Sequence, residues 1–366
     1  MLTGMLVATG IAWAEPTEQQ ARDISNAEAL LRLPDFDLAA RPDLQSSLSR
    51  YLTKYVGTTR YFQLIRQFKL RERSDELLNL ALSKPRSTAG SWAAETLNGF
   101  GHRSRLKEAV SDKDPQRGAA AVILLGETGD ERTPDFLTRT ILNTELATMV
   151  RVASAAALAK QREGDEDLLR LVTEKMLPAD LNFAVGNLLH ASDNSVVRAA
   201  ASEYLPLPPV VGGTPLPPVS VLAAQSGNRD RGQKIFQIKG TCAACHTVAG
   251  EGKAVGPDLT EIGSKLSKEA LYVSILDPNA GISHNYENYE ILTQSGRIET
   301  GLLLSRTGDQ IDIINAEGVV RSFQASDIDS IRQLTISLMP AGLQQTLTKE
   351  ELVDLVEYLT SLKTKQ

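Results

Sequence analysis

Apolar residues recur at helical spacing over the first half of the chain. From about Glu28 to Leu205, Ala and Leu follow a period of three to four residues, which Gly, Asp, Asn or Pro interrupts at short intervals. This pattern predicts a region made entirely of helices. Runs of small residues recur within it at Trp92–Ala94, Gly118–Ala121, Ala153–Ala157 and Val197–Ala201.

These runs lie roughly 25 to 45 residues apart, the range of stacked helix-pair repeats. The pattern resembles HEAT-like repeats, in which Ala lets neighbouring helices approach while Leu and Val fill the seam. A plain helical bundle is the alternative. In either case we expect the region to dock or scaffold a partner, and we expect His102 and His190 to be surface or capping residues rather than ligands.

The composition changes sharply at residues 206–222, where Pro alternates with apolar residues. Proline at this density opposes helix and favours extended polyproline geometry. We therefore predict a semi-rigid linker here, between a helical domain at residues 15–205 and a second domain at residues 223–366.

Length and composition agree with two globular domains. The chain has 366 residues, enough for two buried cores, and its 42% hydrophobic and 23% charged residues are typical of neither disordered nor fibrous proteins. The net charge of -6, with both signs interspersed, gives no basic surface for nucleic acid. We expect electrostatic steering, if any, to favour a partner with a positive face.

The N-terminus is apolar and ends in Ala12-Trp13-Ala14, the small-x-small pattern that signal peptidase cleaves. We predict a signal peptide at residues 1–14 and a periplasmic or otherwise exported protein, although no Lys or Arg precedes Arg22. A frayed N-terminal helix is the alternative. No later segment has the run of about 18 apolar residues that a membrane span requires, so we expect no span in the mature chain.

The clearest chemical signal is Cys242-Ala-Ala-Cys245-His246, which contains both cysteines of the chain. Two thiols one turn apart can bond to the two vinyl groups of one haem, and the adjacent His then faces the iron. A zinc site would need further ligands that no second cysteine pair supplies. The motif therefore predicts one covalent haem c, with Cys242 and Cys245 as attachment residues and His246 as an iron ligand.

Helices are predicted on both sides of the motif. The pattern of residues 228–236 predicts a short helix after a polar cap, and Thr348 with Glu351 forms a predicted capping box. The helix that this box opens has an apolar stripe made by Leu352, Leu355, Val356 and Leu359. An N-terminal helix, a haem loop and a C-terminal helix together are the plan of a small cytochrome c.

The second iron ligand must come from elsewhere in the chain. Met339 is the single methionine after the motif, and Pro340 stiffens its loop. Thioether ligation raises the haem potential, so we favour Met339. His284 is the competing ligand and would give a lower potential, and Met339 could instead fill a gap in the core.

Between the haem loop and Met339, short β-prone runs alternate with hairpin turns. They predict a small antiparallel sheet inserted at about residues 287–332. The fold class we expect is therefore mainly α: a HEAT-like helical domain followed by a class I-like cytochrome c domain with a β insertion. The predicted strands are 289–293, 299–304, 310–314 and 319–323.

The second half of the chain resembles the haem-binding domain family found in Planctomycetes and Verrucomicrobia. The resemblance covers about the last 135 residues and includes the haem motif. It also rests on Gly232 with Phe236, Gly256-Pro-Asp-Leu259, Leu276-Asp-Pro-Asn279, Tyr286-Glu287, Gly296, Gly301, Ser337-Leu-Met-Pro-Ala-Gly-Leu343 and Glu357-Tyr-Leu359.

This resemblance implies that Met339 is the distal iron ligand and that the carbonyl of Pro257 orients His246 by accepting its second ring proton. In this family the haem domain often follows a quinoprotein-type sugar dehydrogenase propeller. No repeated β-blades precede Leu205, so we do not transfer the dehydrogenase activity and expect an electron-transfer protein rather than an enzyme. Its redox partner could be a separately encoded dehydrogenase of that type.

Two other hypotheses about the function remain open at this point. An open sixth iron position would make the protein a haem enzyme or a sensor of gases or peroxide. Alternatively, the helical region could be the main functional part, as a scaffold with an accessory haem. No Ser/His/Asp set, phosphate loop or carboxylate pair indicates another catalytic chemistry.

Overall fold

The computed structural model describes residues 16–364, and the chain divides between Gly129 and Asp130 into two compact units. The signal peptide predicted at residues 1–14 lies outside the described residues. The domain limits predicted at residues 205 and 222 stay predictions. Within residues 16–364, no helix combines the length and the apolar character needed to cross a membrane.

The described part of the first unit is helical. Its first helix begins at a capping box formed by Thr17 and Gln20, and Ser87 and Asp114 cap two later helices. Leu52, Leu64 and Leu77 are fully buried in its core. The helices are α1 (Glu18–Leu31), α2 (Pro42–Lys54), α3 (Thr59–Gln67), α4 (Ser74–Ser83), α5 (Thr88–Gly99), α6 (Arg103–Ala109) and α7 (Pro115–Glu127).

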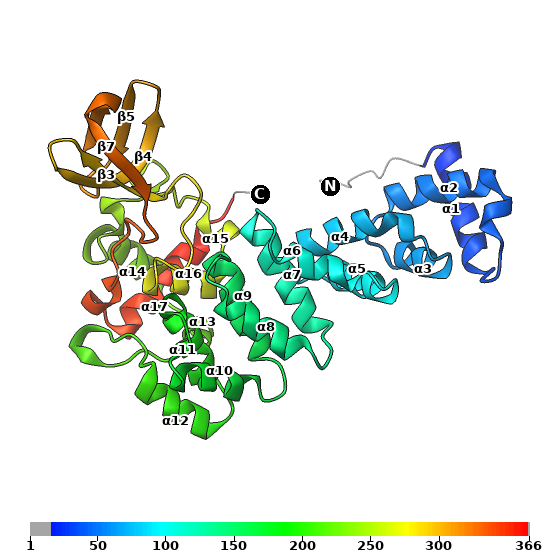
Figure 1. Cartoon of the computed structure of the whole chain (residues 1–366), viewed down its shortest axis with the longest axis horizontal. Coiled ribbons are helices and arrows are strands. Elements are labelled where there is room, and N and C mark those ends of the chain that lie inside the picture. The colour runs from blue at the N-terminus through cyan, green and yellow to red at the C-terminus, as the bar shows by residue number, and fades with distance from the viewer. Residues whose placement is uncertain (1–15, 365–366) are drawn as a thin grey trace, which may run out of the picture. The chain divides into compact units, whose positions relative to one another are not determined.

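The second unit begins with five more helices, which are followed by the haem-motif region (Figure 1). The five are α8 (Thr133–Leu142), α9 (Thr148–Leu158), α10 (Gly164–Thr173), α11 (Asn182–His190) and α12 (Ser195–Tyr204). The prediction of an all-helical first half is thus confirmed. All four small-residue runs lie in helices, and Ala93, Ala121, Ala155 and Ala201 are fully buried. Whether these helices form HEAT-like repeats remains a prediction.

The Pro-rich segment packs into the second unit instead of standing free as a spacer. Its apolar residues Val210, Leu216 and Leu222 are buried in the same cluster as Phe236 and Tyr272. A short helix, α13 (Val219–Ala223), begins directly after Pro218, because proline is compatible with a helix start although not with a helix interior. Sequence analysis noted the apolar residues between the prolines but did not predict that they are buried.

The haem-motif region is built on the crossing of two helices. Helix α14 (Arg229–Lys234) is capped by Asn228, and α17 (Lys349–Ser361) begins at the predicted capping box of Thr348 and Glu351. The helices approach so closely that a Cβ at Gly232 would lie 2.0 Å from the carbonyl oxygen of Asp354. Glycine is therefore required at the crossing. Helices α15 (Ile262–Lys265) and α16 (Lys268–Leu276) complete this part.

The predicted antiparallel sheet is present and has five strands in the order β6-β5-β4-β3-β7. Figure 1 shows it as a separate layer, in the orange part of the chain. The strands are β3 (Asn288–Thr293), β4 (Ile298–Arg306), β5 (Gln310–Ile314), β6 (Val320–Gln324) and β7 (Ile328–Gln333). The first four match the predicted runs. Sequence analysis missed β7. It also missed a short hairpin whose strands, β1 (Thr247–Val248) and β2 (Glu251–Gly252), have two residues each.

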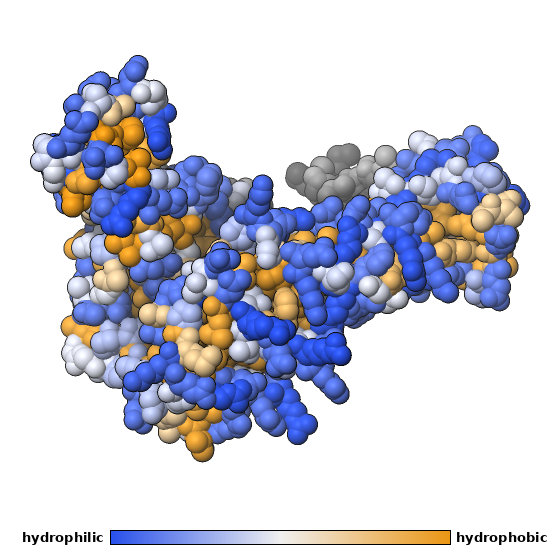
Figure 2. All heavy atoms as spheres, in the orientation of Figure 1, coloured by the Kyte–Doolittle hydropathy of each residue, from blue (hydrophilic) through white to orange (hydrophobic). Residues whose placement is uncertain are grey.

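The sheet has a small hydrophobic core of its own. Ile291, Ile311, Ile313 and Phe323 are buried together, and Leu303 packs against them. This cluster is separate from the cluster that holds α14, α16 and α17 together. The face of the molecule in Figure 2 is largely polar, with apolar residues visible on the sheet and also between helices elsewhere in the chain.

Candidate haem-binding site

The haem motif forms a tight turn directly after α14. A π-helical turn (Ile235–Lys239) leads to Thr241, whose φ of 55° is left-handed, and a 3₁₀ turn then spans Cys242–Ala244. The backbone N–H of His246 donates to the carbonyl oxygen of Cys242 at 2.9 Å. This turn places both sulfurs and the imidazole on one short segment, and both cysteines are free thiols.

Every residue that the sequence predicted for the site lines one cavity. Cys242, Cys245, His246, Pro257 and Met339 all contribute to its wall. The cavity has a volume of about 300 Å³ and a mainly apolar lining that includes Phe236, Leu259, Ile275 and Leu359. A concave, apolar site with a few placed polar groups is typical of cofactor binding.

The tautomer of His246 follows from its hydrogen bond. Nδ1 lies 2.8 Å from the carbonyl oxygen of Pro257, and a carbonyl can only accept, so Nδ1 carries the proton and Nε2 keeps a free lone pair. Burial lowers the pKa of His246, against a smaller raising effect of the bond to Pro257. A neutral imidazole with a fixed tautomer is the form that ligates metals.

The segment after the motif folds back tightly against His246. The N–H groups of Val255 and Gly256 both donate to the carbonyl oxygen of Cys245, at 3.0 Å and 2.7 Å. A Cβ at Gly256 would lie 2.6 Å from Cε1 of His246. Only glycine leaves room for the ring in this position, so the chain is shaped to hold the imidazole.

The Cys242 thiol is a poor nucleophile in this setting. Burial raises the pKa of Cys242 to about 11, so the thiol is protonated at neutral pH. A catalytic or redox-active cysteine needs a lowered pKa. A thioether has no ionisable proton, so attachment to a porphyrin would suit this buried position.

The methionine loop is hydrogen-bonded to the turn that follows α16. The N–H of Ser337 donates to Oδ1 of Asn279 at 2.8 Å, and Oγ of Ser337 accepts from the N–H of Met339 at 3.1 Å. These two bonds fix the backbone on the N-terminal side of Met339, whose side chain is half-buried at the cavity. Sequence analysis noted Asn279 and Ser337 as part of a motif but assigned them no role.

The remaining histidines are not part of the cavity wall. The side chain of His284 is 89% exposed and its Nδ1 lies 3.3 Å from Glu287. His102 contacts the hydroxyl of Ser74 through Nδ1, and Nε2 of His190 lies 3.0 Å from the carbonyl oxygen of Leu205. The cavity is therefore lined by Met339 and by none of these histidines.

Two residues of the β insertion also line the cavity. Leu302 in β4 and Ala316 in the turn between β5 and β6 belong to its wall. Sequence analysis predicted the insertion but gave it no part in the site. No local sequence signal reveals such a contact, because it depends on how the sheet packs against the haem loop.

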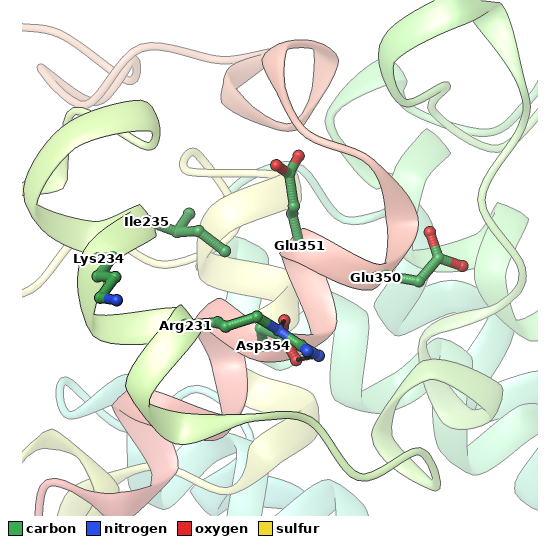
Figure 3. Close-up of a pocket in the computed structure, with 6 residues that line it drawn as sticks. All are labelled: Arg231, Lys234, Ile235, Glu350, Glu351 and Asp354. Atoms are coloured by element: carbon green, nitrogen blue, oxygen red, sulfur yellow. Dashed lines mark hydrogen bonds and ion pairs between the residues drawn. The ribbon is translucent and has the colours of Figure 1, made fainter.

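A second, shallower hollow lies at the crossing of α14 and α17 (Figure 3). Three of the charged groups that line it pair between the two segments: Arg231 with Asp354 at 2.6 Å, and Glu351 with Lys239 at 2.6 Å. These ion pairs stabilise the helix crossing that precedes the haem loop. We assign this hollow a structural role.

Comparison with known families agrees with the geometry of the cavity. Residues 230–298 match the family model named Cytochrome c. The chain thus contains a cytochrome c-like haem-binding domain, which supports haem-based electron transfer. The match includes α14 and the haem motif and ends in β4, before the loop of Met339. Comparison with curated proteins gives no match.

Proposed function

We propose that the chain is an exported mono-haem c-type cytochrome that transfers single electrons. The observation that carries the proposal is the shared cavity: both cysteines, the ring of His246 and the side chain of Met339 line it. These are the groups that a haem requires for two thioether bonds and two axial ligands.

In this proposal, Cys242 and Cys245 would hold the porphyrin through thioethers, and Nε2 of His246 would ligate the iron. A haem bound there would supply a one-electron couple at its iron. Pro257 keeps Nε2 unprotonated through the bond to Nδ1, and the resulting hydrogen bond makes the imidazole a stronger donor. The apolar wall excludes water from the site.

Met339 would be the second iron ligand in this proposal. Asn279 and Ser337 hold its loop, while the competing His284 is exposed to solvent. Thioether ligation combined with an apolar wall gives a relatively high potential. Such a centre fits a carrier that exchanges electrons and binds no substrate at the iron.

We further propose that the helices of residues 15–205 dock a redox partner, and that this partner is a dehydrogenase of the quinoprotein type. The electron would pass from its cofactor to the haem. The second unit carries the haem loop and has 30 acidic and 22 basic residues, a net charge of -8, whereas the first unit has a net charge of +2. This charge of the second unit favours a partner with a positive face.

The proposal is tested by producing the protein in an export-competent host that has haem-attachment machinery. We expect a c-type α-band in the reduced spectrum, which disappears when Cys242 and Cys245 are both replaced by Ala. Slow or absent binding of carbon monoxide to the reduced protein would support Met339 as a ligand. Rapid binding would instead favour a haem enzyme or gas sensor with an open sixth position.

A further inference from the structure

Strand β4 separates two apolar environments. Leu303 packs into the core of the sheet with Ile311 and Ile313, whereas the preceding residue, Leu302, lines the haem cavity. Consecutive residues of a strand point to opposite faces. One face of the sheet therefore covers its own core, and the other face is turned to the cavity. Leu302 is only 4% exposed, so this contact is closely packed.

The neighbouring strands extend this second face. Leu302 pairs with Asn288 in β3 and with Ile314 in β5, and residues paired across strands lie on the same face. Asn288 is 4% exposed, and its Oδ1 has no hydrogen-bond partner within residues 16–364. Buried carboxamide oxygens are normally bonded, so this oxygen can still accept a hydrogen bond, although Asn288 itself is not part of the cavity wall.

The turn between β5 and β6 makes a second contact with the haem loop. Ala316 lines the cavity, and a Cβ at Gly318 would lie 3.2 Å from Cγ2 of Val255. Val255 is buried and immediately precedes Gly256, the residue that packs on the ring of His246. The sheet thus touches the cavity at the middle of β4 and again at this turn.

We propose that the β insertion is part of the haem-binding site, through two residues that we call the insertion wall: Leu302 and Ala316. The insertion wall covers one side of the porphyrin and keeps water away from it. This inference rests on the function proposed above. Oxidised haem iron carries one more positive charge than reduced iron, so an apolar cover that excludes water disfavours the oxidised form and raises the midpoint potential.

The first test compares two identical substitutions on strand β4. Leu302→Asn places a polar group in the insertion wall, while Leu304→Asn changes a side chain that is 54% exposed. We measure the midpoint potential of each haem-loaded protein by a redox titration with optical detection. We expect a lower potential in L302N and the wild-type value in L304N. Equal potentials in all three proteins would overturn the inference.

A second pair of variants covers the case in which L302N fails to fold. Ala316→Asp adds a negative charge to the insertion wall, and Ser295→Asp adds the same charge to the exposed turn between β3 and β4. A negative charge close to the haem stabilises the oxidised form. We therefore expect the midpoint potential to fall further in A316D than in S295D. A fall of the same size in both would contradict the proposal.

The haem content of the wild-type protein separates this inference from the function on which it rests. If the wild type carries covalent haem and L302N and A316D match their controls, the insertion wall is rejected and the cytochrome function stands. If the wild type carries no haem when matured with attachment machinery, the proposed function fails and the inference fails with it.

Discussion

Gly256 lies so close to His246 that a Cβ at position 256 would come within 2.6 Å of Cε1 of the imidazole. The same short segment presents the carbonyl oxygen of Pro257 to Nδ1 at 2.8 Å. One turn of the chain thus sets both the position of the ring and its tautomer. In the proposed function, this pair of contacts holds Nε2 ready for the iron.

Replacement of Gly256 by Ala should therefore disturb the proximal ligand. The methyl group would force the imidazole or the haem loop to move, and we expect the affinity of His246 for iron to fall by about 10- to 100-fold, as for other changes next to metal ligands. The measurement is the haem content of the purified protein and the Soret and α-band spectrum. Gly308→Ala is the matched control, because a Cβ at Gly308 meets nothing within 4 Å. Identical spectra for both variants would refute this role of Gly256.

The hydrogen bond between Asn279 and Ser337 predicts that Asn279 helps to hold Met339 in position. Asn279→Ala removes the acceptor for the N–H of Ser337, a loss of about 0.5 to 1.5 kcal/mol for a neutral hydrogen bond. We expect the methionine loop to loosen and the weak sulfur-to-iron absorption band to disappear at a lower temperature than in the wild type. Asn279→Asp keeps an acceptor oxygen and should restore much of the band. If the band melts equally in all three proteins, Asn279 does not position Met339.

The crossing of α14 and α17 gives a prediction about stability. Gly232→Ala would place a Cβ 2.0 Å from the carbonyl oxygen of Asp354, and such overpacking costs about 1 to 3 kcal/mol. We expect the free energy of unfolding of the haem-bearing unit to fall by this amount, as measured by urea unfolding followed in the haem absorption band. Gly308→Ala again serves as the control and should change it little. An unfolding curve of G232A that overlays the wild type would contradict the packing at this crossing.

The pair of Asp354 and Arg231 gives a prediction about acid stability. Burial raises the pKa of Asp354, but the hydrogen bonds from Arg231 and from the N–H of Asn228 outweigh it, and the net pKa lies below its usual value. A lowered carboxyl pKa stabilises the folded state above the unfolded-state pKa of about 4. This stabilisation is lost as the pH falls through the folded-state pKa.

Asp354→Asn should accordingly lower the free energy of unfolding at neutral pH by about 1 to 3 kcal/mol. It should also flatten the decrease of stability below about pH 4. Asp230→Asn removes an exposed carboxylate from the same helix as Arg231 and should change stability by less than about 0.5 kcal/mol. Urea unfolding at several pH values between neutral and acid tests both expectations. A pH dependence of D354N as steep as that of the wild type would contradict the assignment.

Local signals explain why much of the fold could be predicted from the sequence. The capping box of Thr348 and Glu351 marks the start of α17, and hairpin turns such as Ser295-Gly296 delimit four of the five strands. Strand β7 was missed because Ile328 and Ile331 are three residues apart, with the polar residues Asp329 and Ser330 between them. That spacing does not follow the two-residue period of a strand.

Contacts between segments that are distant in the chain could not be predicted from the sequence. The five predicted site residues do line one cavity, because the motif and the methionine loop each have a distinctive local sequence. The insertion wall has no such mark: Leu302 resembles any other strand leucine, and its role depends on the face that the sheet turns to the haem loop. The packing of the Pro-rich segment went unnoticed for the same reason, since burial of Leu216 and Leu222 depends on partners far along the chain.

The most direct test of the central claim is the intact mass of the protein matured in an export-competent host with haem-attachment machinery. The account predicts the mass of the polypeptide plus one haem, with the added mass retained under denaturing conditions and located by peptide analysis at Cys242 and Cys245. The bare polypeptide mass under these conditions would contradict it, and the cavity of His246 and Met339 would then need another explanation.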